Sequence, residues 1–146
     1  MRLILIDDEL ANVELLKLLL LQRKDVEIIG VYTNSEEAWQ AIRRERPDAI
    51  FTDIEMPRLN GLQLAERTKS LPWDISIVFV TAYVQYAHDA FDLDAIHYLL
   101  KPIEIKRIDD CIERIYRLRP ELRTKPTERQ EIRSFGNFQV FIGDEE

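Results

Sequence analysis

Short apolar runs alternate with amphipathic segments through the first 118 residues of the chain. The runs are rich in branched aliphatic side chains, which is typical of buried strands. They span residues 3–6, 26–31, 49–52, 75–80 and 95–99. Each run is followed by a segment with apolar residues at three- and four-residue steps, the period of a helix with one buried side. These segments cover residues 9–22, 35–44, 62–70, 84–91 and 105–118.

Five strands that alternate with five helices predict a parallel sheet with helices on both faces. Parallel neighbours need crossover connections, each crossover is right-handed, and each helix covers one side of the sheet. The predicted fold is therefore a small, doubly wound α/β domain.

The spacing of apolar residues also predicts which side chains face the core. In the first helix the expected inner positions are Leu10, Val13 or Glu14, Leu18 and Leu21. In the second helix they are Ala38, Ala41 and Ile42, after Ser35 as the N-cap. In the last helix they are Ile105, Ile108, Ile112 and Ile115.

The character of the chain changes after Leu118. Residues 120–131 are charged, include two prolines and have no apolar period, as expected of a linker. Residues 132–135 and 138–142 flank Gly136-Asn137 and predict two strands joined by a tight turn. We therefore expect a domain over residues 1–119, a linker over 120–131, and the first strands of a truncated output domain over 132–146. The alternative is a β-hairpin-like tail that folds back onto the first domain.

Composition narrows the class of protein. The chain has 146 residues, of which 46% are hydrophobic and 32% charged, enough for one compact domain and a short extension. A net charge of -7 argues against broad nucleic-acid affinity. Cys111 is the single cysteine, which fits a reducing compartment and favours the cytoplasm. The apolar run at the N-terminus is too short for a signal peptide or a membrane span.

Polar residues follow four of the predicted strands at the point where each strand ends. They are Asp7-Asp8, Asp53, Thr81 and Lys101. The carboxyl ends of parallel strands lie at the same edge of a sheet, where ligands of such folds bind. These side chains are therefore expected to converge.

Three converging carboxylates repel one another unless a cation lies between them. Mg²⁺ prefers carboxylate and carbonyl oxygens and commonly bridges them to a phosphoryl group. Lys101 adds a positive charge and Thr81 a hydroxyl, both suited to a tetrahedral oxyanion. His88 and His97 lack the paired spacing of metal ligands. The sequence thus predicts magnesium and a phosphoryl group on or near Asp53.

These motifs resemble the receiver domain of bacterial two-component response regulators over residues 1–119. The resemblance rests on the acid pair Asp7-Asp8, on Thr52-Asp53-x-x-Met56-Pro57 with Asn60-Gly61 downstream, on Val80-Thr81-Ala82, and on Tyr98-x-x-Lys101-Pro102. It implies a flavodoxin-like sheet of order 2-1-3-4-5. It also implies a sensor histidine kinase as partner and no enzymatic turnover beyond self-phosphorylation or self-dephosphorylation.

The resemblance further implies a role for each site residue. Asp53 is the implied phosphoacceptor, with Mg²⁺ bound by Asp8 and the Glu55 backbone carbonyl directly and by Asp7 through water. Lys101 is expected to pair with the phosphoryl group before a cis peptide bond to Pro102.

Thr81 and Tyr98 are the switch residues implied by the same resemblance. Thr81 is expected to move to the phosphoryl oxygen and Tyr98 to swing inward behind it, a population shift between two packings. The shift reaches the face made by the fourth helix, fifth strand and fifth helix, where this family usually forms homodimers. Ordinary alternatives remain: Thr81 as a helix cap, Tyr98 as a half-buried strand residue, and Lys101 as a solvated strand end.

The tail resembles the opening strands of winged-helix transcriptional activators of the antibiotic-regulatory type. The match covers residues 132–141, Ile-Arg-Ser-Phe-Gly-Asn-Phe-Gln-Val-Phe. It implies transcription regulation, with DNA bound only through the missing part of the output domain. Two other functions stay open: a phosphatase of the haloacid-dehalogenase type, with Glu55 as its second acid, and an interaction module that works without phosphorylation.

Overall fold

The computed structural model describes residues 1–124. The strands are β1 (Arg2–Ile6), β2 (Glu27–Tyr32), β3 (Ala49–Thr52), β4 (Ser76–Thr81) and β5 (His97–Leu100). The helices are α1 (Leu10–Leu20), α2 (Ser35–Glu45), α3 (Gly61–Lys69), α4 (Ala87–Asp92), α5 (Ile105–Leu118) and α6 (Glu121–Thr124).

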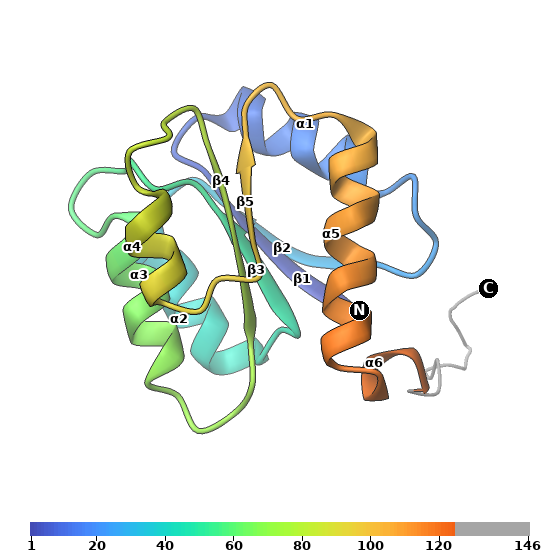
Figure 1. The fold of residues 1–146 in the computed structure, drawn as a ribbon. Helices are drawn as coiled ribbons and strands as arrows, with labels where there is room; N and C mark the ends of the chain where they lie inside the picture. The colour runs from blue at the N-terminus through green and yellow to red at the C-terminus, as the bar shows by residue number, and fades with distance from the viewer. Residues whose placement is uncertain (125–146) are drawn as a thin grey trace. The chain divides into compact units, whose positions relative to one another are not determined.

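All strand pairs are parallel, and the order across the sheet is β2-β1-β3-β4-β5. Figure 1 shows α1 and α5 on one face of the sheet and α2, α3 and α4 on the other. The doubly wound α/β fold and the order 2-1-3-4-5 are therefore confirmed.

The register of the strands brings their carboxyl ends to one edge. Ile6 is paired with Thr52, and the amide of Asp53 donates to the carbonyl of Ile6 at 3.0 Å. On the other side of the sheet, the amide of Lys101 donates to the carbonyl of Thr81 at 2.9 Å. Asp53, the residue after β3, therefore lies beside the end of β1, and Lys101, the residue after β5, lies beside the end of β4.

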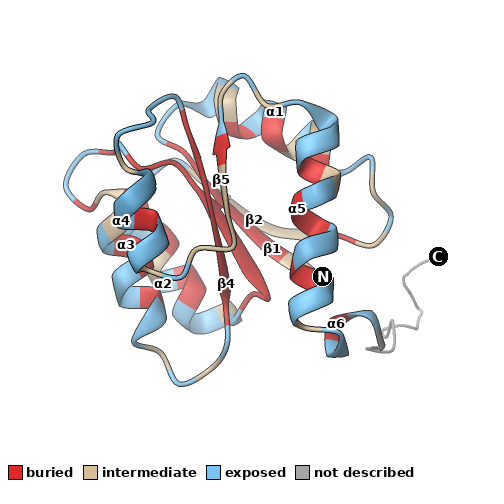
Figure 2. Ribbon diagram, in the orientation of Figure 1, coloured by how far each residue is buried: buried red, intermediate tan, exposed pale blue. Residues whose placement is uncertain are grey.

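The central strands are buried at nearly every position, as Figure 2 shows for β1, β3 and β4. Their large side chains include Phe51 and Phe79, both fully buried. The α2 residues Ala38, Ala41 and Ile42 are also fully buried, as their spacing predicts. Burial of this apolar area contributes about 25 cal/mol per Å² to stability, and the strands that carry the site are part of this buried core.

The inner face of α1 differs from the prediction. Val13 is fully buried as expected, but the other core residues are Leu16 and Leu20. Leu10, Leu18 and Leu21 are 61%, 65% and 48% exposed, so their predicted inner positions are wrong. Leucines nearly encircle this helix, and packing against the sheet rather than spacing selects which of them are buried.

Two further local predictions are corrected. The N-cap of α2 is Asn34 rather than Ser35, because the Asn34 side chain accepts a hydrogen bond from the amide of Glu37 at 3.0 Å. In α5, Ile108, Ile112 and Ile115 are fully buried, but Ile105 is 38% exposed. Ile105 is the first residue of α5, one turn before the helix reaches the core.

Helix α4 begins at Ala87, three residues after Val84, where the pattern predicts its start. Residues before it form a loop held by two tyrosine hydroxyls. The Tyr98 hydroxyl donates to the carbonyl of Tyr83, and the Tyr86 hydroxyl donates to the carboxylate of Glu55. These bonds fix the loop outside helical geometry.

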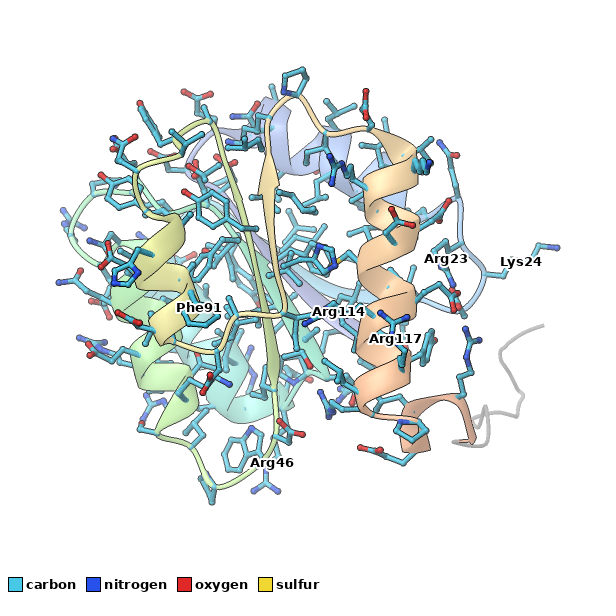
Figure 3. All side chains as sticks on the ribbon, viewed as in Figure 1. Arg23, Lys24, Arg46, Phe91, Arg114 and Arg117 are labelled. Carbon is cyan, nitrogen blue, oxygen red and sulfur yellow. The ribbon has the colours of Figure 1, made fainter. Side chains whose placement is uncertain are left out.

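An ion-pair network joins the loop after α1 to α5. The Arg23 guanidinium, labelled in Figure 3, binds Asp25 at 2.7 Å, Glu113 at 2.8 Å and Asp109 at 3.2 Å. The hydrogen bond with Asp25 and those with Glu113 and Asp109 outweigh the cost of burial and raise the pKa of Arg23. The network fastens α5 to the β2 side of the fold.

The chain divides into two units after Ile115. In the second unit, the segment predicted as a linker begins with the short helix α6, and the Arg123 guanidinium lies 4.1 Å from the ring centroid of Tyr116. The rest of the linker and the predicted strands over 132–146 lie outside the described residues. Within residues 1–124, no helix is both long and apolar enough to span a membrane.

Candidate functional site

Lys101 connects two of the strand-end carboxylates. Its ammonium donates to Oδ2 of Asp7 at 2.8 Å and to Oδ2 of Asp53 at 3.2 Å. Burial disfavours the ammonium, but the hydrogen bond to Asp7 and the charge of Asp53 outweigh that cost and raise the pKa of Lys101. Asp7 and Asp53 are only 4% and 8% exposed, so this cation partly neutralises two buried anions.

The second oxygen of each buried carboxylate accepts from a backbone amide. Oδ1 of Asp53 accepts from Ile54 at 2.7 Å, and Oδ1 of Asp7 accepts from Glu9 at 3.0 Å. Both carboxylates are therefore fixed in orientation by one amide and one ammonium. Such preorganised groups are typical of a site that binds charge.

Asp8 completes the carboxylate cluster. Asp7, Asp8 and Asp53 each offer an oxygen, and these oxygens lie within 4.8 Å of one another. Partial burial, followed by the charges of Asp7 and Asp53, raises the pKa of Asp8. Lys101 supplies one positive charge against three carboxylates, so the cluster has an excess of negative charge. An oxygen-rich, anionic donor set of this kind fits a magnesium ion.

The backbone of Asp53 lies directly against the start of α3. A Cβ added to Gly61 would lie 2.0 Å from the carbonyl oxygen of Asp53, closer than any real contact. The Gly61 amide donates to the carbonyl of Ile54 at 2.8 Å, and a capping box between Asn60 and Gln63 starts the helix. Gly61 is thus required for the close packing that positions Asp53.

Thr81 is the last residue of β4, as predicted, and Tyr98 lies within β5; the structure shows both side chains bonded to the β4–α4 loop. Thr81 is fully buried, and its hydroxyl accepts from the amide of Tyr83 at 3.3 Å. Tyr98 is half-buried, its hydroxyl donates to the Tyr83 carbonyl, and burial raises its pKa. Both side chains therefore meet at Tyr83 in this conformation. The Lys101–Pro102 peptide bond is cis, the isomer that the resemblance implies.

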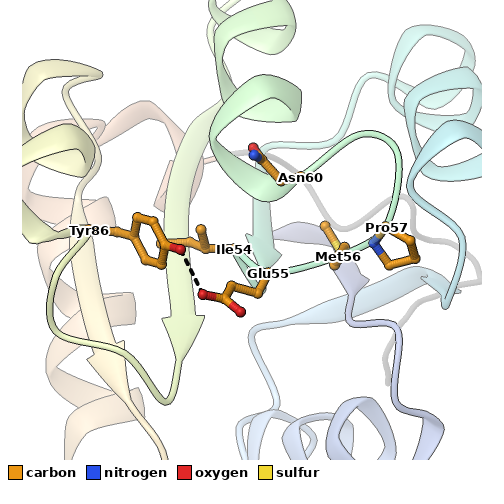
Figure 4. A pocket seen from close by; sticks show the side chains of 6 residues that line it. All are labelled: Ile54, Glu55, Met56, Pro57, Asn60 and Tyr86. Atoms are coloured by element: carbon orange, nitrogen blue, oxygen red, sulfur yellow. Dashed lines mark hydrogen bonds between the residues drawn. The ribbon is translucent and has the colours of Figure 1, made fainter.

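Glu55 has a partner that the sequence did not suggest. Its carboxylate accepts from the hydroxyl of Tyr86 at 2.6 Å, and the two side chains line an open pocket of about 390 Å³ (Figure 4). The residues are 31 apart, and no spacing rule relates a loop after one strand to a loop after the next. The one feature of the sequence that could have suggested this contact is the presence of Tyr86 in the loop after β4.

Comparison with known proteins identifies the family. The family model for the response regulator receiver domain matches residues 3–113. The chain belongs to the response regulator receiver family. Its receiver domain therefore covers most of the described residues and includes every member of the carboxylate cluster. The predicted resemblance over residues 1–119 is confirmed at this level.

Curated relatives share this receiver domain. A response regulatory protein of Yersinia pestis is 43% identical over 119 residues, which are 80% of this chain and 49% of that protein. The transcriptional regulatory protein BtsR of Salmonella typhi is 40% identical over 116 residues, 78% of this chain and 47% of that protein. The chain thus spans about half the length of the curated relatives it matches.

Solved structures agree with the receiver fold. The response regulatory domain of mrkE from Klebsiella pneumoniae has a TM-score of 0.74 at 30% identity and covers 86% of this chain and 100% of that one. A LuxR-family DNA-binding response regulator from Staphylococcus aureus has a TM-score of 0.67 at 28% identity, over 78% of this chain and 97% of that one.

Proposed function

We propose that this receiver domain is a phosphorylation-dependent switch in two-component signalling, with Asp53 as the phosphoacceptor. The observation that carries the proposal is the bridge from Lys101 to Asp7 and Asp53 within a cluster of three carboxylates. A structural ion pair needs one carboxylate. An anionic cluster with one shared cation instead suits a site where a metal and a phosphoryl group balance the charges.

The phosphoryl donor in this proposal is a phosphohistidine of a sensor histidine kinase. An oxygen of Asp53 forms a bond to phosphorus while the phosphorus–nitrogen bond breaks, and the histidine nitrogen keeps the electron pair. Asp8, Asp53 and the Glu55 carbonyl would hold Mg²⁺, with Asp7 acting mainly through water. When bound there, the ion would supply positive charge that offsets the charge of the phosphoryl oxygens.

Phosphorylation of Asp53 then changes the hydrogen-bond partners of Lys101. Its ammonium leaves the Asp53 carboxylate for a phosphoryl oxygen while staying near Asp7. Thr81 releases the Tyr83 amide and donates to another phosphoryl oxygen, and Tyr98 leaves the Tyr83 carbonyl and turns inward. The β4–α4 loop loses its present anchors, which shifts the population of its conformations.

The surface that responds is the α4–β5–α5 face, which we propose mediates homodimerisation. Phe91 on α4 is 78% exposed, Leu100 at the end of β5 is 46% exposed, and Ile105 at the start of α5 is 38% exposed. Phe91 is labelled in Figure 3. An exposed large apolar side chain on each of these three elements supports the proposal that the face is covered by a partner.

The output in this proposal is transcriptional. Residues 132–146 resemble the start of a winged-helix activator, and DNA would be bound through parts of that domain beyond Glu146. The length of the curated relatives and the name of BtsR, a transcriptional regulatory protein, support an additional output domain. We place the protein in the cytoplasm, where a histidine kinase transfers its phosphoryl group, and we propose no catalytic turnover of external substrates.

Phosphorylation of the purified chain tests the function. With Mg²⁺ and acetyl phosphate as a small donor, we expect one phosphoryl group per chain by intact-protein mass spectrometry. Asp53→Asn should abolish the modification, as should a chelator. Asp92→Asn, an exposed aspartate of α4, is the control and should be modified like the wild type.

Other outcomes support the competing functions. Repeated turnover of a generic phosphomonoester would indicate a phosphatase. A wild-type chain that takes up no phosphoryl group, and shows no Mg²⁺-dependent spectral change with a phosphoryl mimic, would indicate an interaction module that works without phosphorylation.

A further inference from the structure

Two acids next to the carboxylate cluster do not contribute oxygens to it. In the described part of the chain the cluster consists of Asp7, Asp8 and Asp53, although Glu9 and Glu55 follow these residues within two positions. Glu55 instead accepts from the hydroxyl of Tyr86 at 2.6 Å, and Glu9 accepts from Nδ2 of Asn12 at 2.9 Å. Each flanking carboxylate is thus bound by a neutral donor.

The hydrogen bond, rather than packing, fixes the position of Glu55. Glu55 is exposed, and the pocket it shares with Tyr86 is open and holds about 390 Å³ (Figure 4). A glutamate has three side-chain torsions and loses much rotamer freedom when it is fixed. The hydrogen bond from the Tyr86 hydroxyl is therefore the contact that holds the carboxylate beside the start of α4.

A neutral donor has a different effect from a cation at this position. A lysine or arginine would add positive charge beside the phosphoacceptor and compete with a bound cation. The tyrosine hydroxyl binds the carboxylate and leaves the net charge unchanged.

We propose that Tyr86 is a positioning residue that keeps the carboxylate of Glu55 out of the cation site and so limits that site to three carboxylates. This inference rests on the proposed magnesium site. With Glu55 held by Tyr86, the cluster binds Mg²⁺ weakly enough to exchange, and no additional negative charge faces an incoming phosphoryl donor. Release of Tyr86 adds a fourth carboxylate to the site.

Magnesium titration of Tyr86→Phe tests the role without phosphorylation. Amide chemical shifts of Asp53 and Ile54 in labelled protein report binding of the metal alone. Removing the hydroxyl should lower the Kd for Mg²⁺ roughly fivefold, the factor that corresponds to about 1 kcal/mol for one added charge near 4 Å in a solvated site. Tyr83→Phe is the matched control in the same loop and should leave the Kd unchanged.

A double-mutant cycle separates the role of Glu55 from a general effect on the loop. Glu55→Gln alone should change the Kd less than about twofold, because the carboxylate is already outside the site. Tyr86→Phe should then have no further effect in the Glu55→Gln background. Circular dichroism of each variant checks that the fold is retained.

Two results would overturn the inference. Unchanged Mg²⁺ affinity in Tyr86→Phe would show that Glu55 stays outside without its partner, and an equal change in both backgrounds would show an effect that does not pass through Glu55. Wild-type protein that shows no Mg²⁺-dependent shifts would reject both the inference and the proposed metal site, whereas the first two results leave phosphorylation of Asp53 intact.

Discussion

At the scale of single residues, the site depends on contacts made by backbone as much as by side chains. Asp53 is held by the Ile54 amide and the Lys101 ammonium, and its carbonyl lies against Gly61. The strand pattern predicted that Asp53 and Lys101 converge at one edge of the sheet. The sequence suggested only that Asn60-Gly61 favours a turn. It did not show that Gly61 is needed for close packing, because the approach of two backbone segments is a property of the folded chain.

Gly61→Ala tests that close approach. Alanine has the higher helix propensity, so a permissive first position of α3 would be stabilised by up to about 1 kcal/mol. We expect instead a loss of roughly 1–3 kcal/mol in the free energy of unfolding, because the new Cβ meets backbone that is unable to move aside. Urea denaturation measures the change.

Gly30→Ala is the matched control for Gly61→Ala. A Cβ at Gly30 would lie 2.6 Å from Cε2 of Tyr32, the far end of a side chain that can rotate away. Its cost should be within about 0.5 kcal/mol. Equal stability changes in the two variants would contradict the role assigned to Gly61.

At the scale of elements, α1 shows where periodicity is insufficient. Leucine occupies positions 15, 16, 18, 19, 20 and 21, so several faces of the helix are apolar. Val13, Leu16 and Leu20 face the sheet, while Leu18 is 65% exposed. The hydrophobic pattern correctly predicted a helix here but did not fix its rotation about its axis.

A pair of substitutions on α1 measures this rotation. Leu16→Ala should lower the free energy of unfolding by about 2–5 kcal/mol, because it removes buried methyl groups and leaves a cavity. Leu18→Ala should change it by no more than about 0.5 kcal/mol. The apolar spacing alone places Leu18 in the core, and so predicts that Leu18→Ala costs more than Leu16→Ala. Thermal or urea unfolding of the two variants decides between these predictions.

At the scale of the whole molecule, nearly all of the buried hydrophobic residues in the described part of the chain belong to the first unit; Tyr116 and Leu122 belong to the second. The sheet and the cluster that packs α2 and α3 against it lie entirely within Met1–Ile115. The receiver domain should therefore fold without the predicted output strands. The tail would then be a separate functional module.

Truncation after Thr124 tests this independence. Removing residues 125–146 should change the melting temperature by less than about 2 °C, because every buried residue of the described part of the chain is kept. A fall of more than about 5 °C would support the alternative in which the tail packs as a hairpin on the receiver domain. Differential scanning calorimetry of both chains provides the measurement.

The sequence alone determined the alternation of strands and helices, the fold class, and the convergence of Asp7, Asp53 and Lys101. These follow from local rules: apolar runs form buried strands, and the carboxyl ends of parallel strands share an edge. The order of the strands came with the family resemblance, and the structure confirms it.

Tertiary structure decided what local rules leave open. It selected the buried face of α1, required a glycine where α3 meets Asp53, and paired Glu55 with Tyr86. Each of these depends on the distance between segments far apart in the chain. Packing at close density fixes such distances, and no periodicity along the sequence encodes them.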